Sequence, residues 1–192
     1  GPYTYTTWSI DTKTTGQSFG QALSGLNKGS KYYFIAEAKN SVGIGSGSEL
    51  TFLTKPDPPT DLSASSAGTT QIDLSWTKGN GAQKTKIQRK QGSYPTNRND
   101  GTQVYFGTGT TKPDTGLTES TTYYYRAWSY VQGSQQWSDD YAEASATTGE
   151  GPGQPDIAVS PPSFDVTLPQ STTQDYTLNI GNTGGAALTY TI

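Results

Sequence analysis

Two segments of the chain share one pattern, and this pattern restricts the possible folds more than any other feature. The downstream copy, residues 116–130, reads GLTESTTYYYRAWSY, and the upstream copy, residues 25–39, reads GLNKGSKYYFIAEAK. In each copy a leucine precedes, by six residues, a tyrosine that opens an alternating run, and alternation is the period of a β-strand. The pattern predicts a central strand of a β-sandwich, entered through a turn whose backbone bonds to the tyrosine hydroxyl.

The alternation gives each of these strands an inner and an outer face. In the downstream copy we expect Tyr123, Tyr125 and Ala127 to point into the core. In the upstream copy the inner face holds Tyr32 and three residues that follow it at even positions: Phe34, Ala36 and Ala38. Four residues are predicted to have a structural role: Tyr32, Trp76, Leu117 and Tyr123.

The composition agrees with an all-β chain. Thirteen tyrosines and four tryptophans must supply much of the core, because only 30% of the 192 residues are hydrophobic. Aromatic residues and threonine favour strands, and no window has apolar residues at helical spacing. No apolar run approaches the roughly 18 residues that span a bilayer. The net charge is −3 and the bases form no stripe, so we expect no nucleic-acid partner.

The chain divides into four parts. Residues 1–56 are predicted to be the later strands of one sandwich, with strands expected at 3–10, 15–23, 32–39 and 49–54. Residues 57–148 form a complete sandwich behind a proline-stiffened boundary that holds Pro56, Pro58 and Pro59. Residues 149–155 are a glycine-rich linker, and residues 156–192 are the first strands of another module, with alternation at 157–159, 164–168 and 176–180. We expect the chain to be a piece of a longer precursor.

Residues 60–148 carry strand signals at intervals of about ten residues. Strands are expected at 61–65, 71–77, 84–90, 101–106 and 137–147 in addition to the tyrosine-led strand, with Ile72, Leu74 and Trp76 buried. The succession of a Pro-Pro pair, Leu62, Trp76, Leu117, Tyr123 and a closing Thr-Thr pair resembles a fibronectin type III domain of the bacterial and archaeal extracellular kind. Upstream, LSGL, YYFIAEAKNSVG and GSELTFLT resemble the last five strands of a second copy. Downstream, LNIGNTG resembles a different Ig-like module.

The residue types exclude several chemistries. The segment contains no cysteine and no histidine, so it holds no serine triad, cysteine dyad or histidine-ligated zinc site. The acidic residues, Asp57, Asp61, Asp100, Asp114, Asp139 and Asp140 among them, are interpreted as turn formers. A calcium site formed by Asp139 and Asp140 near Asp114 is the alternative, but the sequence has no calcium-loop motif. We therefore expect no enzyme activity, no catalytic residue, no metal and no cofactor.

The best candidate for ligand binding is the outer face of the tyrosine-led strand. The alternation places Tyr124, Arg126, Trp128 and Tyr130 on this face, Lys86 and Gln88 beside them, and Tyr94 and Trp137 in flanking loops. Such a face stacks sugar rings in some proteins, stabilises an exposed sheet through cross-strand pairs in others, and in others is buried against a neighbouring subunit. The candidate ligand-binding residues are Tyr124, Arg126, Trp128, Tyr130 and Trp137.

These observations predict a non-catalytic, extracellular or cell-surface modular protein that acts as a spacer, adhesion or assembly module. One alternative is a carbohydrate-contacting accessory module of a secreted polysaccharide-degrading enzyme. Another is a subunit of an extracellular filament, in which strands of the C-terminal half-domain of one copy complete the N-terminal half-domain of the next. The expected partners are proteins, further copies of the chain or a glycan.

Overall fold

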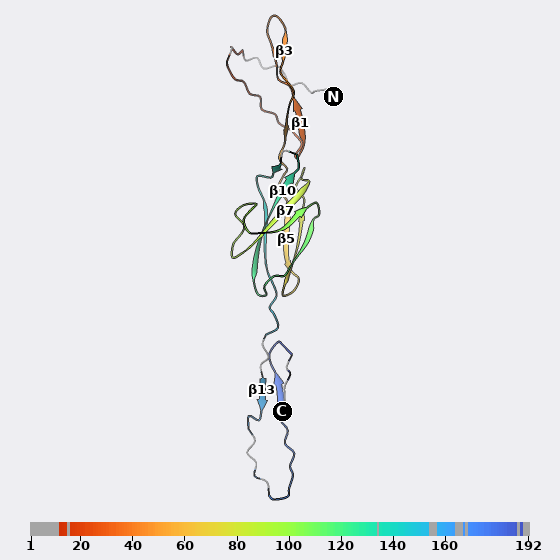
Figure 1. The fold of residues 1–192 in the computed structure, drawn as a ribbon, viewed down its shortest axis with the longest axis vertical. Helices are drawn as coiled ribbons and strands as arrows, with labels where there is room; N and C mark the ends of the chain where they lie inside the picture. Colours follow the sequence, from red (N-terminus) through yellow and green to blue (C-terminus); the bar gives the residue numbers. More distant parts are fainter. Residues whose placement is uncertain are drawn as a thin grey trace.

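The computed structural model describes residues 12–14, 16–133, 135–153, 157–163, 167, 169–187 and 189. Figure 1 shows an N-terminal segment, a middle sandwich and a C-terminal segment that follow one another along the long axis. Every regular element in the described ranges is a strand, which confirms the predicted all-β class. The described ranges hold no helix long and apolar enough to cross a membrane.

The middle segment is a sandwich of two antiparallel sheets. One sheet has the order β5-β6-β9, and the other has the order β11-β10-β7-β8, with β12 also paired to β10. The strands are β5 (Thr60–Ser66), β6 (Gln71–Thr77), β7 (Lys84–Gln91), β8 (Thr102–Gly107), β9 (Thr111–Thr115), β10 (Thr122–Val131), β11 (Gln136–Trp137) and β12 (Ala142–Thr147).

The core lies between these two sheets and follows the alternation of the sequence. On β6, Ile72, Leu74 and Trp76 are buried while the residues between them are exposed. From the other sheet come Ile87 of β7 and the inner face of β10, with Leu117 from the turn before β10: Tyr123, Tyr125 and Ala127 belong to the same cluster. The predicted inner faces of this segment are therefore confirmed.

The middle segment differs from the sequence prediction at two places: the strand expected at 137–147 is divided into β11 and β12, and β9 was not expected. β9 contains Pro113, which lies opposite Asp73 of β6. Proline cannot donate to a sheet ladder and is tolerated on edge strands, and β9 is an edge strand of its sheet. A proline inside a short polar run hides the strand from a pattern search.

The N-terminal segment forms two antiparallel strand pairs. β1 (Lys31–Phe34) pairs with β4 (Leu50–Leu53), and β2 (Glu37–Lys39) pairs with β3 (Ile44–Ser46). The prediction of one continuous strand over residues 32–39 is wrong. Residues 35–36 are not in a strand, and the pairing partner changes from β4 to β3 across them.

The other expectations for this segment have mixed outcomes. Tyr32 stacks on Phe52 with the ring centroids 5.6 Å apart. Phe34, predicted to face inward, is 38% exposed, and Leu50, opposite it on β4, is 57% exposed. The strand predicted at 15–23 is wrong, since residues 16–23 form no strand; two glycines and a turn leave this stretch without a pairing partner. The strand expected at 3–10 lies outside the described residues.

The C-terminal segment contributes one described strand pair. β13 (Ile157–Ser160) is antiparallel to β14 (Asn179–Asn182). After β14 the Asn182 side chain holds a turn, because its Nδ2 donates to the Ala186 carbonyl at 2.6 Å and its Oδ1 accepts from the Gly184 amide. The strand expected at 164–168 falls almost entirely outside the described residues.

Candidate functional site

The outer face of the large middle sheet carries most of the candidate ligand-binding residues. Tyr124, Arg126 and Tyr130 alternate on β10 with the buried core residues, and each is partly exposed. The β7 partners across the ladder are Lys90 for Tyr124, Gln88 for Arg126 and Lys84 for Tyr130. Trp137 of β11 pairs directly with Tyr130. The structure therefore brings four of the five predicted residues to one face as partly accessible groups.

Trp128, the fifth, is not accessible. Its side chain is 3% exposed, so its predicted place on an open platform is wrong. Tyr141 packs edge-on against it with the ring centroids 5.8 Å apart. Gln88, also expected beside the platform, is likewise buried, and its Nε2 donates to the Arg98 carbonyl at 2.5 Å. Tyr141 lies against Trp128 and the Arg98 backbone lies against Gln88, so the outer face is partly covered by other residues.

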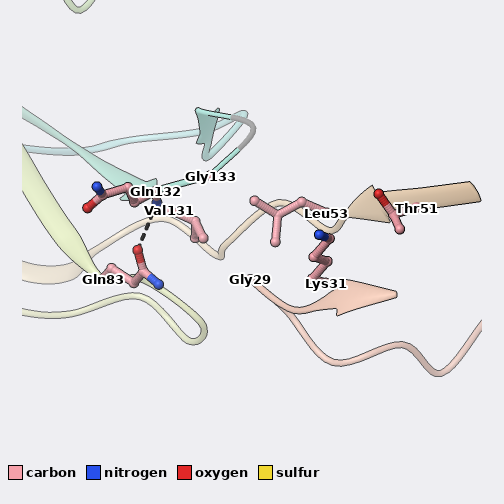
Figure 2. A pocket seen from close by; sticks show the side chains of 8 residues that line it. All are labelled: Gly29, Lys31, Thr51, Leu53, Gln83, Val131, Gln132 and Gly133. Carbon is pink, nitrogen blue, oxygen red and sulfur yellow. Dashed lines mark hydrogen bonds between the residues drawn. The ribbon is translucent and has the colours of Figure 1, made fainter. Parts of the chain in front are cut away.

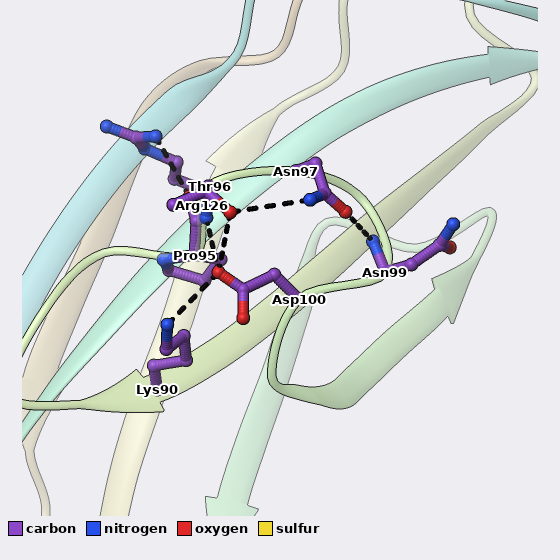
Figure 3. Close-up of polar contacts among 7 residues, drawn as sticks. All are labelled: Lys90, Pro95, Thr96, Asn97, Asn99, Asp100 and Arg126. Carbon is purple, nitrogen blue, oxygen red and sulfur yellow. Dashed lines mark hydrogen bonds and ion pairs between the residues drawn. The ribbon is translucent and has the colours of Figure 1, made fainter.

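The β7–β8 loop, residues 92–101, covers part of this face. Pro95 at its centre is fully buried, and the Arg126 guanidinium donates to the Pro95 carbonyl at 2.9 Å (Figure 3). Figure 3 also shows the carboxylate of Asp100, which accepts from the amide and the hydroxyl of Thr96 at 2.7 and 2.8 Å. Lys90 donates to the same carboxylate at 3.1 Å. The loop is thus bonded to itself and to both strands beneath it.

These hydrogen bonds shift the pKa of the Asp100 carboxyl group. The Thr96 amide and hydroxyl, followed by Lys90, lower the pKa of Asp100 to about 2. Hydrogen bonds to the ionised form favour that form, so the loop conformation is coupled to an ionised Asp100. The sequence interpretation of Asp100 as a residue that bonds its local backbone is confirmed.

The partly accessible aromatic residues of this face form two groups. In one, Arg126 lies between Tyr94 and Tyr141, with its guanidinium carbon 5.3 and 4.0 Å from the two ring centroids. Its Nη2 also pairs with Glu143 at 3.0 Å, so this group has a balanced charge. In the other, Phe106, Tyr130 and Trp137 contact one another with ring centroids 4.6 to 6.0 Å apart.

The three residues of the middle segment that are predicted to be structural are buried. The Tyr123 hydroxyl accepts from the Thr118 amide at 2.9 Å, five residues upstream, and Leu117 and Trp76 are each 4% exposed. Burial alone raises the pKa of Tyr123, but the Thr118 and Gln91 donors outweigh it and leave that pKa lowered. In the upstream copy, the Tyr32 hydroxyl accepts from the Asn27 amide at 2.8 Å. The predicted tyrosine-to-backbone bond is therefore present in both copies.

The sequence pattern gave no indication of a buried polar network in the core. Asp114 accepts from Arg89 at 2.7 Å through one carboxylate oxygen and from the Tyr125 hydroxyl at 2.9 Å through the other. Asp114 is 7% exposed, so its interpretation as a turn former is wrong. Asp114 lies in the polar run of residues 107–116, which carries no burial signal, and only the pairing of β9 with β6 places it inside.

The same contacts bear on the calcium alternative. Both oxygens of Asp114 have partners, and Asp139 pairs with Lys55 at 2.5 Å. Within the described ranges no three acidic side chains gather as a metal site would require.

A second feature with functional meaning is the joint between the N-terminal segment and the sandwich. The Asp57 amide, in the proline-rich boundary, donates to the Asn80 carbonyl at 3.0 Å, and Pro56 and Pro59 on either side are buried. The turn of Gly29 meets the turn of Gly81 so closely that a Cβ on either would overlap the other's backbone. Both glycines have positive φ, at 58° and 74°.

Two ion pairs flank the joint. Lys28 pairs with Asp57 at 3.1 Å, and Lys55 pairs with Asp139. All four side chains are at least 41% exposed, and exposed ion pairs contribute about 0–1 kcal/mol each. The backbone contacts and the glycine packing therefore hold the joint more than the charges do.

A hollow of about 360 Å³ opens beside the joint. Figure 2 shows Gln83 and Gln132 on its sandwich side, joined by a hydrogen bond, and Lys31, Thr51 and Leu53 on its N-terminal side. The bond runs from the Gln132 amide to the Gln83 side-chain oxygen at 2.8 Å. Lys31 is the one ionisable side chain in the lining, so the hollow has no pair of groups for acid–base chemistry.

Comparison with known proteins gives the following. No family model matches the chain, and no curated protein matches it either. Among solved structures, a Fn3-like protein from Clostridium thermocellum is similar at 30% identity and a TM-score of 0.38, over 50% of this chain and 95% of that one. FN3tt is similar at 19% identity and a TM-score of 0.41, over 50% and 97%. Domains d3–d4 of the rat CD45 extracellular region are similar at 16% identity and a TM-score of 0.41, over 75% and 79%.

The fibronectin type III fold of the middle segment is carried by its own strand order. Strands β5-β6-β9 face strands β11-β10-β7-β8, and a tyrosine on β10 bonds the turn before it.

Proposed function

We propose that this chain is a spacer segment of a modular extracellular protein, in which the sandwich is joined stiffly to the module before it. The observation that carries the proposal is the joint. Support comes from the docking of the Asp57 backbone on the turn at Asn80 and from the contact of Gly29 with Gly81. A flexible tether would leave its residues in solvent, whereas Pro56 and Pro59 are buried. The extracellular location follows from the sequence resemblance to extracellular modules.

The proposal treats residues 1–56 and 57–148 as successive modules. Proline fixes φ and removes a hydrogen-bond donor. A boundary with three prolines therefore loses little backbone conformational entropy when it docks on the sandwich. Interfaces between domains of one chain otherwise permit relative motion by default. A joint stabilised by backbone contact transmits orientation and tension from one module to the next, which a spacer or adhesion segment requires.

Distances between two spin labels test this proposal. The chain has no cysteine, so single cysteines at Val42, which is 93% exposed, and at Thr108, an exposed loop residue, give one defined pair. We expect a narrow distance distribution in the parent chain. Gly81→Ala should broaden it, because the new Cβ would overlap the Lys28 backbone.

Gly92→Ala is the matched control. Gly92 has nearly the same φ, 75°, but nothing lies within 4 Å of a Cβ placed there. It therefore carries the backbone strain of the Gly81 substitution without the overlap, and the distribution should stay narrow. A broad distribution in the parent chain, or no difference between the two alanine variants, would contradict the stiff joint.

A second candidate function is assembly into a head-to-tail filament by strand complementation. Support comes from exposed apolar side chains on the N-terminal strand pair, where Tyr33 and Leu50 are 52% and 57% exposed, and on β13, where Ile157 is 56% exposed. Light scattering of the purified chain tests it. A mass that grows with concentration is expected, and a monomer at all concentrations would refute it.

A further inference from the structure

Three cations surround the aromatic group on the outer face of the sandwich. The Lys84 Nζ lies 5.1 Å from the centroid of Phe106, the Lys86 Nζ lies 5.9 Å from that of Trp137, and the Arg98 guanidinium carbon lies 4.9 Å from the same ring. We call this set, together with Tyr130, the cationic corner: Lys84, Lys86, Arg98, Phe106, Tyr130 and Trp137. Its members come from β7, β8, β10, β11 and the β7–β8 loop.

The charge of the cationic corner has no carboxylate to balance it. In the part of the chain that the structure describes, no acidic side chain lies within ion-pair distance of Lys84, Lys86 or Arg98. Three acids of the neighbouring surface are engaged elsewhere: Glu143 with Arg126, Asp100 with Lys90 and Asp139 with Lys55. Three like charges therefore share one corner of a chain whose net charge is −3.

Burial and the neighbouring cation act on the pKa of Lys86 in the same direction. Partial burial, and after it the nearby Arg98 guanidinium, lower the pKa of Lys86. Like charges disfavour the ionised form of each other, and an anionic ligand would relieve this repulsion. The cation–π contacts relieve this repulsion only in part, since such contacts are weak at exposed sites.

The rings of the cationic corner form a rigid, partly open surface. Phe106 and Trp137 are nearly parallel, with an interplanar angle of 24° and centroids 6.0 Å apart. Phe106 remains 41% exposed, while Tyr130 and Trp137 are partly buried and fixed by each other at 4.6 Å. Rings held by a sheet lose little conformational entropy when a flat ligand packs on them.

We propose that the cationic corner binds an acidic polysaccharide of the uronic-acid type. The apolar face of a sugar ring would pack on Phe106, and the sugar carboxylates would pair with Lys84 and Arg98. Charge-assisted hydrogen bonds are about twice as strong as neutral ones, and a cation over a ring keeps its outward N–H groups available for a carboxylate. This site differs from an open aromatic platform in two ways. It does not include the buried Trp128, and it requires a negatively charged ligand.

Other anionic polymers fit less well. A nucleic acid depends on many phosphate contacts, and the corner offers three cations. Acidic peptide motifs bind clusters of basic residues, but they carry no apolar sugar face that could pack on the rings of the corner. A polymer of uronic acids supplies both an apolar ring face and a carboxylate on every sugar.

Affinity electrophoresis and calorimetry on the whole chain test the proposal, with polygalacturonate as the probe. Its methyl-esterified form keeps the sugar rings and removes the charge, and poly-glutamate keeps the charge and removes the rings. We expect binding to polygalacturonate that weakens as salt is added, because salt screens exposed charges. Binding to both of the other polymers should be at least about tenfold weaker.

Variants of the corner sharpen the test. Lys84→Gln combined with Arg98→Gln should weaken binding to polygalacturonate by about tenfold or more, and Phe106→Ala should also weaken it. Lys112→Gln is the matched control, since Lys112 lies on β9 of the opposite sheet; it removes a charge and should leave binding unchanged. Near-ultraviolet circular dichroism verifies that each variant is folded.

Three results would overturn the proposal. The first is no binding to polygalacturonate by the folded chain. The second is equal binding to poly-glutamate or to the methyl ester, which would mean that charge alone or rings alone suffice. The third is a loss with Lys112→Gln as large as that with the double variant. None of these outcomes bears on the joint, so the spacer proposal is tested separately.

Discussion

Replacing Asp114 by alanine tests whether a buried charge pair stabilises the sandwich. The Asp114 carboxylate accepts two charge-assisted hydrogen bonds, at 2.7 Å from Arg89 and at 2.9 Å from Tyr125. The side chains of Asp114 and Arg89 are 8% and 20% exposed, so Asp114→Ala leaves a largely buried guanidinium without its carboxylate. Breaking a buried pair in this way costs about 3–5 kcal/mol. Because Arg89 reaches some solvent, we expect about 3 kcal/mol.

The expected loss is large for a domain of this size. Domains of this kind have total stabilities of about 5–15 kcal/mol, and each kcal/mol lowers Tm by roughly 4–8 °C. Asp114→Ala should therefore lower the Tm of the sandwich by roughly 12–24 °C, followed by tryptophan fluorescence. Asp73→Ala on β6 is the control, since Asp73 is exposed and its loss should cost less than about 1 kcal/mol.

A double variant identifies the cause of the loss. If the unpaired guanidinium dominates, adding Arg89→Ala to Asp114→Ala should cost little more than Asp114→Ala alone. A change of less than about 1 kcal/mol for Asp114→Ala, similar to that of Asp73→Ala, would refute the argument. So would fully additive losses in the double variant, because they would mean that the two side chains act independently.

Three further predictions concern tyrosines and the β7–β8 loop. Tyr123→Phe removes the acceptor of the Thr118 amide and of the Gln91 side chain and should cost about 1–2 kcal/mol in denaturant unfolding, whereas an unchanged midpoint would show that the turn does not need the hydroxyl. Because the pKa of Asp100 is about 2 against an ordinary 3.8, its contribution to loop stability is present above pH 4 and is lost as the pH falls toward 2; the Thr96 amide resonance should follow this titration, and a midpoint near 4 would contradict it. Burial, and after it the Asp114 carboxylate, raise the pKa of Tyr125, so stability should fall above about pH 10, where the unfolded chain ionises and the folded chain does not. Tyr125→Phe should reduce this alkaline loss, and an unchanged alkaline loss would assign it to other groups.

The middle segment was predictable because its alternation is strict. Leu117 and Tyr123 predicted both a central strand and a bond from the tyrosine hydroxyl to the preceding turn. The strand is β10, and the Thr118 amide is the donor to the hydroxyl. The two inner faces that matter most, on β6 and β10, follow directly from a period of two.

The upstream copy shows the limit of such reasoning. It has the same leucine-to-tyrosine spacing and the same hydroxyl bond, to Asn27, yet its strand divides into β1 and β2. Local pattern predicts which residues favour an extended conformation, but pairing depends on which partner strand lies beside them.

The sequence predicted which residue types form the candidate site, but it did not predict which of their side chains are accessible to solvent. The alternation placed Tyr124, Arg126 and Tyr130 on one face, and β10 has them there. Trp137, expected in a flanking loop, instead pairs with Tyr130 on β11. The alternation could not reveal that residues 92–101 fold across the face and that Trp128 is buried there. A loop's path depends on side-chain bonds such as Arg126 to Pro95, which join residues distant in sequence.

The sequence by itself therefore determined the fold class, the inner faces of the middle sandwich and the tyrosine-held turns, because each depends on residues a few positions apart. The tertiary structure alone decided that Asp114 is inside, that Gly29 meets Gly81, and that Lys84, Lys86 and Arg98 meet at one corner. Each of these is a contact between elements brought together by sheet pairing, and no local periodicity encodes which side chains will meet across it.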